Sequence, residues 1–200
     1  MLLPLAWLVR LHDTPEYREW LLAAATDLLR RQDPCGAIAE EVGSAGLGSY
    51  GPPQMNAEYG TTEAPLIQRN GDPLSDLLYT TNFALVGLHE ASAATGDALY
   101  KDGEDRLADF LCRIQIRSEA HDELDGGWFR AFDHQRWAYW ASNADAGWGA
   151  WSIESGWTQA WITSVLAFRQ LGVSYWDLTS GSRIGSTLAD LLPVMLPGVA

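Results

Sequence analysis

Residues 17–32, YREWLLAAATDLLRRQ, and residues 100–115, YKDGEDRLADFLCRIQ, are two copies of one pattern that decides the fold. The copies have equal length, and Leu28 of the first aligns with Leu111 of the second. In both, apolar residues recur at helical spacing, which predicts an amphipathic helix. A pattern that returns after a fixed interval indicates a structural unit that occurs more than once.

A shorter apolar helix and a tight turn precede each copy. Leu5–Leu11 is followed by HDTPE, and Leu77–Ala94 is followed by TGDAL. Near the C-terminus, Trp157–Leu171 supplies an apolar helix, GVSYWD a turn, and Arg183–Leu196 a partner helix whose last turn is weakened by Pro193. The sequence therefore predicts an all-α fold of about three helical hairpins.

The composition suits a folded protein. A chain with 47% apolar residues can bury a sizeable core, so we expect a single helical-hairpin domain over residues 1–200. The formal net charge of −13, with scattered basic residues, disfavours nucleic acid and anionic membranes as partners. The opening MLLPLAWLV is too short to span a bilayer. It starts inside a helical pattern without a cap, so we expect a fragment of a longer protein.

Two long connections, residues 36–76 and residues 117–156, separate the hairpins. Connections of this length are usually functional or disordered, and their aromatic and glycine content argues against disorder. Together they carry 13 acidic and 4 basic residues, a net charge of −9. Each leaves an amphipathic helix and enters an apolar one, so antiparallel stacking predicts that both lie at one end of the helices. We expect that end to be an acidic, aromatic rim.

Seven of the ten tryptophans lie between Trp128 and Trp161, together with only three acids, Asp133, Asp145 and Glu154. A flat aromatic ring covers the apolar face of a pyranose, while a carboxylate accepts hydroxyl hydrogen bonds or moves a proton. The alternative is a helical core rich in large side chains, because tryptophan is mostly buried. Glycines punctuate the stretch, so much of it is not regular helix interior. The stretch indicates a sugar-binding surface.

Alternating apolar and amphipathic helices, with long loops at one rim, resemble the (α/α)6 toroid of the six-hairpin glycosidases and related sugar epimerases. Residues 88–115, LHEASAATGDALYKDGEDRLADFLCRIQ, resemble the inner-helix, turn and outer-helix passage of that superfamily. Residues 124–133, LDGGWFRAFD, resemble its loop after an outer helix. A complete toroid has six hairpins, so the resemblance implies about half a ring.

The expected partner is the remaining half of the toroid, supplied by the same longer chain or, less favoured, by a second copy. An open arc is the third arrangement. It would leave apolar residues of the second inner helix exposed, and large exposed apolar patches signal a missing partner. These residues are Leu77, Leu78, Phe83, Leu85, Val86 and Leu88.

Glycoside hydrolysis commonly uses two carboxyl groups, one as acid and one as base or nucleophile. Asp145 lies among small residues near Trp148, where the backbone can approach a ligand. Glu154 precedes an apolar helix, whose N-terminus stabilises an anion, and its alternative role is that of an ordinary acid at a helix start. Asp125, before two glycines, is the third catalytic candidate, with a turn-forming role as the alternative.

Other residues are candidates for binding the sugar. Asn82 and His89 lie seven residues apart on one helix face, and Asn82 is nearer the loops, whereas His89 is more simply an interior histidine. Asp76 is better explained as a helix cap, and Trp161 is as compatible with the core as with the rim. The predicted substrate-binding residues are Trp128, Trp148, Trp151, Trp157, Glu63, Tyr59, Asn82 and Arg130.

No cofactor and no metal are expected. The four histidines are not spaced as a ligand pair, and no HExxH string occurs. Cys35 and Cys112 lack a nearby cysteine and are expected to be buried thiols, with a disulfide as the less favoured alternative. Calcium held by Asp122 and Asp125 is a lesser alternative.

The sequence thus predicts a carbohydrate-active enzyme that resembles glycoside hydrolases and binds an oligo- or polysaccharide in a Trp-lined acidic cleft. The first alternative is a sugar epimerase or isomerase, in which His89 or His134 would shuttle protons. The second is a noncatalytic carbohydrate-binding or structural helical domain, which would keep the aromatic surface without a working pair of acids.

Overall fold

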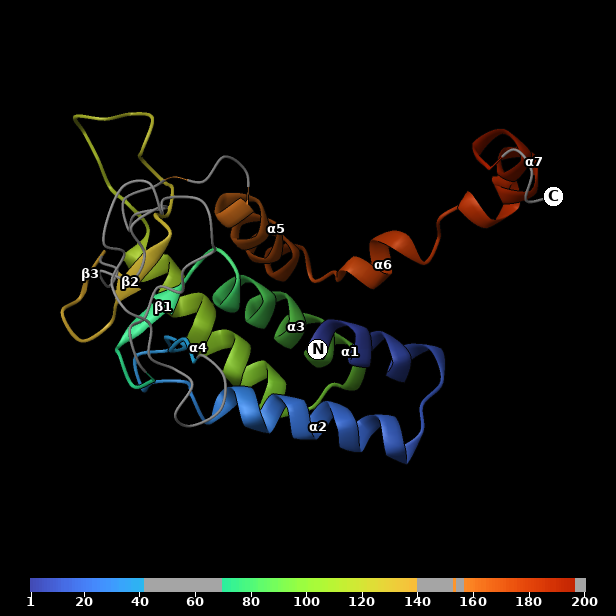
Figure 1. Cartoon of the computed structure of the whole chain (residues 1–200), viewed down its shortest axis with the longest axis horizontal. Helices are drawn as coiled ribbons and strands as arrows, with labels where there is room; N and C mark the ends of the chain where they lie inside the picture. The colour runs from blue at the N-terminus through green and yellow to red at the C-terminus, as the bar shows by residue number, and fades with distance from the viewer. Residues whose placement is uncertain (42–69, 140–152, 154–156, 197–200) are drawn as a thin grey trace, which may run out of the picture.

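The structure, a computed structural model, consists mainly of helices with one small sheet (Figure 1). It describes residues 1–41, 70–139, 153 and 157–196. The helices are α1 (Leu2–Leu11), α2 (Pro15–Leu29), α3 (Thr80–Thr95), α4 (Ala98–Ile114), α5 (Trp157–Leu171), α6 (Tyr175–Thr179) and α7 (Ile184–Met195). The strands are β1 (Leu74–Asp76), β2 (Ala131–Asp133) and β3 (Ala138–Tyr139). The predicted helical character is confirmed, and the sheet is an addition to the all-α prediction.

The first two predicted hairpins are present, and capping residues define their turns. In HDTPE, the Thr14 side chain accepts a hydrogen bond of 3.2 Å from the backbone N–H of Tyr17 and so caps α2. In TGD, Gly96 ends α3 in the left-handed region with a φ of 69°. Asp97 then caps α4 by accepting from the N–H of Leu99 at 2.9 Å. Local capping chemistry therefore sets both reversals of the chain.

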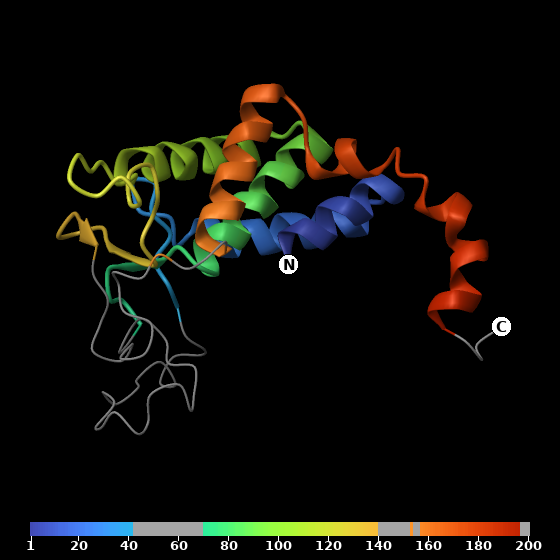
Figure 2. The ribbon, with the colours of Figure 1, turned by 90° about the horizontal axis from the view of Figure 1, so that it is seen from above.

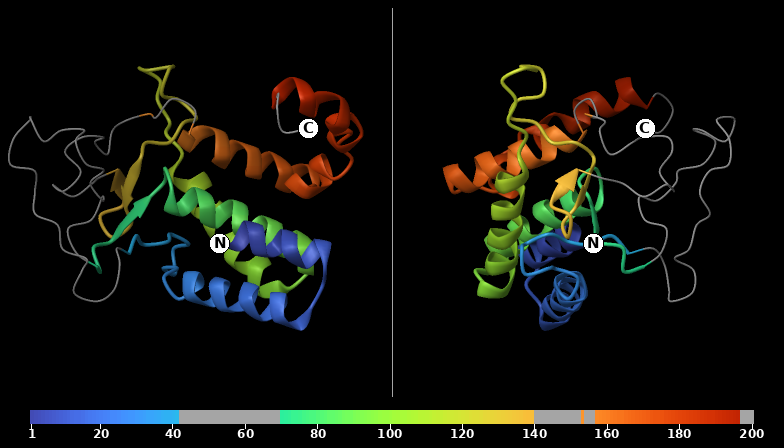
Figure 3. Two further views of the ribbon diagram at one scale, coloured as in Figure 1. Left: turned by 45° about the vertical axis from the view of Figure 1, so that its right-hand side comes forward. Right: turned by 90° about the vertical axis from the view of Figure 1, so that its left-hand side faces the viewer.

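Helix α3 is the centre of the bundle. It contacts α1, α4 and α5, and Figure 3 shows α5 running beside it. Gly87 brings α3 close to α1, since an added Cβ would lie 2.6 Å from the Cβ of Leu2. Five of the six apolar residues expected to be exposed in an open arc are therefore buried, and only Phe83 is exposed: the buried five are Leu77, Leu78, Leu85, Val86 and Leu88.

The third predicted hairpin does not close. The turn GVSYWD forms α6 instead, and α7 projects beyond the end of the bundle (Figures 1 and 2). The cause lies at the link, where Ser174 caps α6 and the buried Glu90 carboxylate of α3 accepts from the N–H of Tyr175 at 2.7 Å. These bonds direct the chain away from α5. The apolar side chains that α7 leaves exposed are Ile184, Leu188, Leu191, Leu192, Val194 and Met195.

The described parts of the two long connections pair with each other in a small sheet. β1 belongs to the first connection and pairs antiparallel with β2 of the second, with Leu74 opposite Asp133 and Asp76 opposite Ala131. β3 extends the sheet on the other side of β2. We call this the loop end; it carries the sheet and the first turns of α3 and α5 (Figure 1). Within the described residues, none of the helices is long and apolar enough to cross a membrane.

Candidate functional site

Asp76 organises the entry into α3 at the loop end. Its carboxylate accepts hydrogen bonds from the backbone N–H groups of Leu78 at 2.9 Å and Tyr79 at 3.2 Å, so it stabilises the turn before α3, whose N-cap residue is Tyr79 rather than the predicted Asp76. Burial raises the pKa of Asp76, while these N–H groups and the positive charge of Arg130 oppose the rise. The backbone of Arg130 is fixed as well, because its carbonyl accepts from Leu77 N–H at 2.7 Å.

Four buried polar side chains gather at the loop end, from β1, α3 and α5. In the described part of the chain, one oxygen of each lacks a hydrogen-bond partner: Ser75 Oγ, Thr81 Oγ1, Asn82 Oδ1 and Thr158 Oγ1. The Asn82 amide does donate to the Leu78 carbonyl at 3.2 Å, which aligns its side chain. Leaving a buried polar group unpaired costs about 1–3 kcal/mol. Such a set suits a water or a ligand hydroxyl as donor.

An aromatic surface also lies at the loop end. Phe83, in the first turn of α3, is 58% exposed. Its ring stacks with Tyr79 at a centroid separation of 6.5 Å and meets Trp161 of α5 edge-on at 6.1 Å. Tyr79 and Trp161 are half-buried. We call these three rings the aromatic face; it bridges the first turns of two helices at the loop end.

Comparisons with family models, curated proteins and solved structures give no match. The aromatic face and the buried oxygens of the loop end therefore have to be interpreted from their own chemistry. A sugar offers apolar CH faces, which stack on exposed rings, and hydroxyl donors, which bind polar groups that lack a donor. These two features suit a saccharide.

Trp128 is not available for stacking, and this corrects the prediction. It is 3% exposed and belongs to the hydrophobic core. Its indole Nε1 donates to the carbonyl of Leu111 at 2.9 Å, and its backbone N–H donates to Gln159 Oε1 at 2.9 Å. The turn before it, which contains Gly126 with a φ of 80°, folds the ring inward between α4 and α5. Phe83, one of the inner-helix residues that an open arc would expose, is the exposed ring at this end.

The other predicted residues fall into two groups. Asn82 and Arg130 lie at the loop end and are buried, whereas Asp125 is exposed and accepts from the backbone N–H of Ser118 at 3.0 Å, as a turn-forming aspartate does. Trp157 opens α5, but its side chain is not described. The predicted residues outside the described part of the chain are Asp145, Glu154, Trp148, Trp151, Tyr59 and Glu63.

Sequence reasoning missed the pairing of Tyr79 with Phe83. The available signal was the spacing of four residues in YTTNF at the start of an apolar helix, which places two rings on one face. Exposure of that face was not foreseeable, because it depends on where α5 packs. The order of elements places the acid- and tryptophan-bearing sequence between β3 and α5, and both of these elements flank the loop end.

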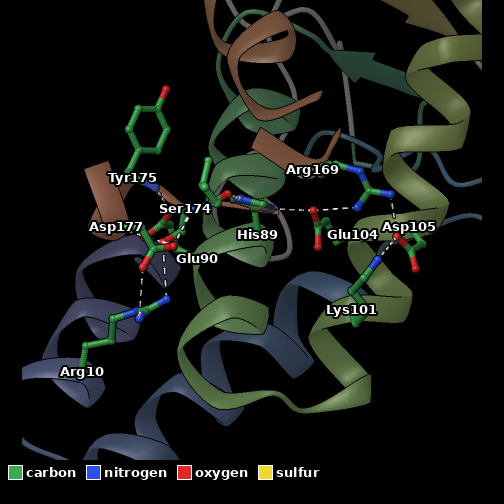
Figure 4. Close-up of polar contacts among 11 residues, drawn as sticks. Arg10, His89, Glu90, Lys101, Glu104, Asp105, Arg169, Ser174, Tyr175 and Asp177 are labelled. Atoms are coloured by element: carbon green, nitrogen blue, oxygen red, sulfur yellow. Dashed lines mark hydrogen bonds and ion pairs between the residues drawn. The ribbon is translucent and has the colours of Figure 1, made fainter. Parts of the chain in front are cut away.

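A second polar group, the charge network, lies away from the loop end (Figure 4). His89 Nδ1 lies 2.8 Å from Glu104 Oε1, and its Nε2 lies 2.9 Å from the carbonyl oxygen of Val173. Arg169 binds Glu104 at 2.6 Å and Asp105 at 2.6 Å. The prediction that His89 is a satisfied interior histidine is therefore confirmed, which leaves it badly placed to shuttle protons in an epimerase.

Burial disfavours charge in this network, but the partners outweigh it. Burial alone would lower the pKa of His89. Its bonds to Glu104 and to the Val173 carbonyl favour the imidazolium and raise the pKa overall. The pKa of Glu104 is lowered, because hydrogen bonds from His89 and Arg169 overcome burial. In both groups the partners therefore favour the charged form more than burial disfavours it.

Among the described residues, the two cysteines and His134 belong to no metal site. Cys112 is exposed, which corrects the prediction of two buried thiols, and Cys35 is half-buried with a pKa raised by burial. Both are free thiols. His134 Nε2 lies 3.9 Å from the Asp33 carboxylate. Across the described ranges, His, Cys, Asp and Glu side chains form no group of three or more that would suit a metal ion.

Proposed function

We propose that the chain is a carbohydrate-active, glycoside hydrolase-like domain that binds a saccharide at the aromatic face. The exposed ring of Phe83, in contact with Tyr79 and Trp161, carries this proposal. A pyranose laid on these rings would lie at the same end of the bundle as the buried oxygens of Ser75, Thr81, Asn82 and Thr158.

The catalytic groups of this proposal come from the connection between β3 and α5. Asp145 and Glu154 are its carboxyl-bearing residues, and Trp148 and Trp151 add further rings. Hydrolysis would need one of the two acids protonated and the other ionised, on opposite sides of the glycosidic bond. Asp125 is the weaker third candidate, since its carboxylate serves a turn.

The binding part of the proposal predicts a specific loss on removing one ring. Replacing Phe83 with alanine is expected to weaken oligosaccharide affinity about tenfold, which corresponds to about 1.4 kcal/mol, because an exposed stacking ring is lost while the core is untouched. Isothermal titration against a panel of neutral oligosaccharides measures this. Phe83→Tyr should retain binding, since a phenol presents the same flat face.

The matched control is Trp20→Ala, which removes an exposed aromatic residue on α2, outside the aromatic face. It should leave affinity unchanged.

Turnover assays on Asp145→Asn and Glu154→Gln, with Asp102→Asn as control, separate the alternatives. If the wild type releases new reducing ends and the two acid variants do not, hydrolysis is supported. If the wild type binds the sugar without any turnover, the noncatalytic domain is supported. Solvent deuterium entering the sugar without bond cleavage supports the epimerase. Equal affinity of Phe83→Ala and the wild type would refute the binding site.

The proposed partner is the rest of an (α/α)6 ring, from a longer chain or a second copy, and α7 is the described element that would contact it. Its apolar side chains are exposed, Ile184 by 71% and Leu188 by 50%. We expect the 200-residue chain to self-associate, and Leu188→Glu with Leu192→Glu to reduce its mass to that of a monomer. Sedimentation velocity measures both. A wild-type monomer at all concentrations would count against an interface on α7.

A further inference from the structure

We propose that His89 is a proton-operated tether, which holds the link between α5 and α6 on α3 when protonated and releases it when neutral. This inference does not rest on the proposed function. It starts from the position of the imidazole, which lies between Glu104 Oε1 at 2.8 Å and the Val173 carbonyl oxygen at 2.9 Å (Figure 4). Both partners are acceptors only, so filling both bonds requires two N–H groups on one ring.

Only the imidazolium has two N–H groups. When His89 loses a proton, one ring nitrogen presents a lone pair to an acceptor. Glu104 keeps the remaining N–H, because it is an ionised carboxylate that Arg169 holds in place at 2.6 Å. The bond that breaks is therefore the one to Val173, the residue between the end of α5 and the cap of α6.

The charges around His89 favour this order of events. The raised pKa of His89 reflects Glu104 and the Val173 carbonyl, which outweigh burial. Lys101 is already paired with Asp105, and Arg10 of α1 faces Asp177 rather than the imidazole. The titratable and charged groups that face His89 or its immediate partners are Glu90 of α3, Lys101 and Glu104 of α4, Arg169 of α5, Asp177 of α6 and Arg10 of α1.

A second contact keeps the link attached after release. Glu90 accepts from the backbone N–H of Tyr175 at 2.7 Å and from the Trp7 indole at 2.7 Å, and neither donor titrates near neutral pH. The link is therefore expected to loosen rather than to detach. Because the Tyr175 ring contacts Trp161 at a centroid separation of 6.3 Å, loosening reaches the edge of the aromatic face.

The sign of the effect follows from the raised pKa of His89. The tether contributes fully below the ordinary histidine pKa, and its contribution is lost as pH rises through the folded-state pKa. A hydrogen bond to a charged group is worth enough to change a local opening equilibrium about tenfold. Amide exchange in residues 172–176 should therefore quicken about tenfold between about pH 5.5 and about pH 8.5, beyond the intrinsic change with pH.

Hydrogen exchange with mass spectrometry tests this on the whole chain. His89→Gln, which cannot titrate, should abolish the extra pH dependence in residues 172–176, while His121→Gln, at an exposed histidine distant in sequence from the link, should retain it. If His89→Gln fails to fold, nitrogen NMR of the wild-type imidazole decides. Two protonated ring nitrogens at the lower pH and one at the higher support the tether. A neutral ring at the lower pH, or exchange that follows the intrinsic rate alone, overturns it.

Discussion

Replacing Arg169 with leucine is expected to lower the free energy of unfolding by about 3 kcal/mol, because removing one partner of a buried ion pair leaves the other uncompensated. The stranded group is Glu104, which is 1% exposed and binds Arg169 at 2.6 Å. His89 remains beside Glu104, which keeps the loss below that of a fully isolated charge. Urea denaturation followed by circular dichroism measures the change.

Lys101→Leu is the matched control, because Lys101 also pairs with Asp105 but at an exposed site. It should cost at most about 1 kcal/mol. Adding Glu104→Gln to Arg169→Leu should recover part of the stability, since no buried carboxylate is then left behind. Equal losses of unfolding free energy from Arg169→Leu and Lys101→Leu would show that the buried pair contributes no more to stability than the exposed one.

The same pair predicts how stability depends on acid. The pKa of Glu104 is lowered in the folded protein, so its contribution is complete above the ordinary glutamate pKa and is lost as pH falls through the folded value. Arg169→Leu weakens one cause of that lowered pKa. The stability difference between wild type and Arg169→Leu should therefore shrink as the solution is acidified, and a constant difference would contradict the assignment.

Replacing Gly36 with alanine is expected to destabilise the protein by about 3 kcal/mol or more, through backbone strain combined with a steric clash. Gly36 has a φ of 100°, and an added Cβ would lie 2.1 Å from the carbonyl oxygen of Arg106. Neighbouring bonds hold this approach in place, since Gln32 Nε2 donates to the carbonyls of Gly36 and Gly103. Thermal and urea unfolding measure the loss.

Gly71 supplies a control with the same backbone and open space. Its φ is 99°, and an added Cβ would meet nothing within 4 Å. Gly71→Ala should therefore cost about 1–2 kcal/mol from strain alone. The difference between the two variants isolates the close approach of residue 36 to α4. If both variants lose the same amount, the first connection is not packed on α4 as described.

Much of the helical framework was predictable, because its causes are local. The turn HDTPE contains the cap Thr14, and TGD contains both Gly96, which ends one helix, and Asp97, which begins the next. Caps and helical periodicity act over a few residues, so the sequence displays them directly. The order of inner and outer helices predicted the two long connections at one end, and the pairing of β1 with β2 is the described contact between them.

The candidate site was less predictable, because exposure is a tertiary property. Trp128, within the second connection, and Phe83, soon after the first, are both large aromatic residues, and composition does not tell them apart. Packing buries Trp128 by giving its indole the Leu111 carbonyl as acceptor, whereas Phe83 stays outside on the same bundle. The third hairpin failed for a similar reason, as Glu90 of α3 redirects the chain at Tyr175.

The sequence by itself determined most of the helical segments and the caps of the first two hairpins. These features depend on neighbours a few residues away. Only the tertiary structure decided which rings are exposed, that α7 projects from the bundle, and that Glu104 pairs with both His89 and Arg169. Those contacts join residues far apart along the chain. Long-range packing and hydrogen-bond partners decide which side chains are buried, and no local sequence pattern contains that information.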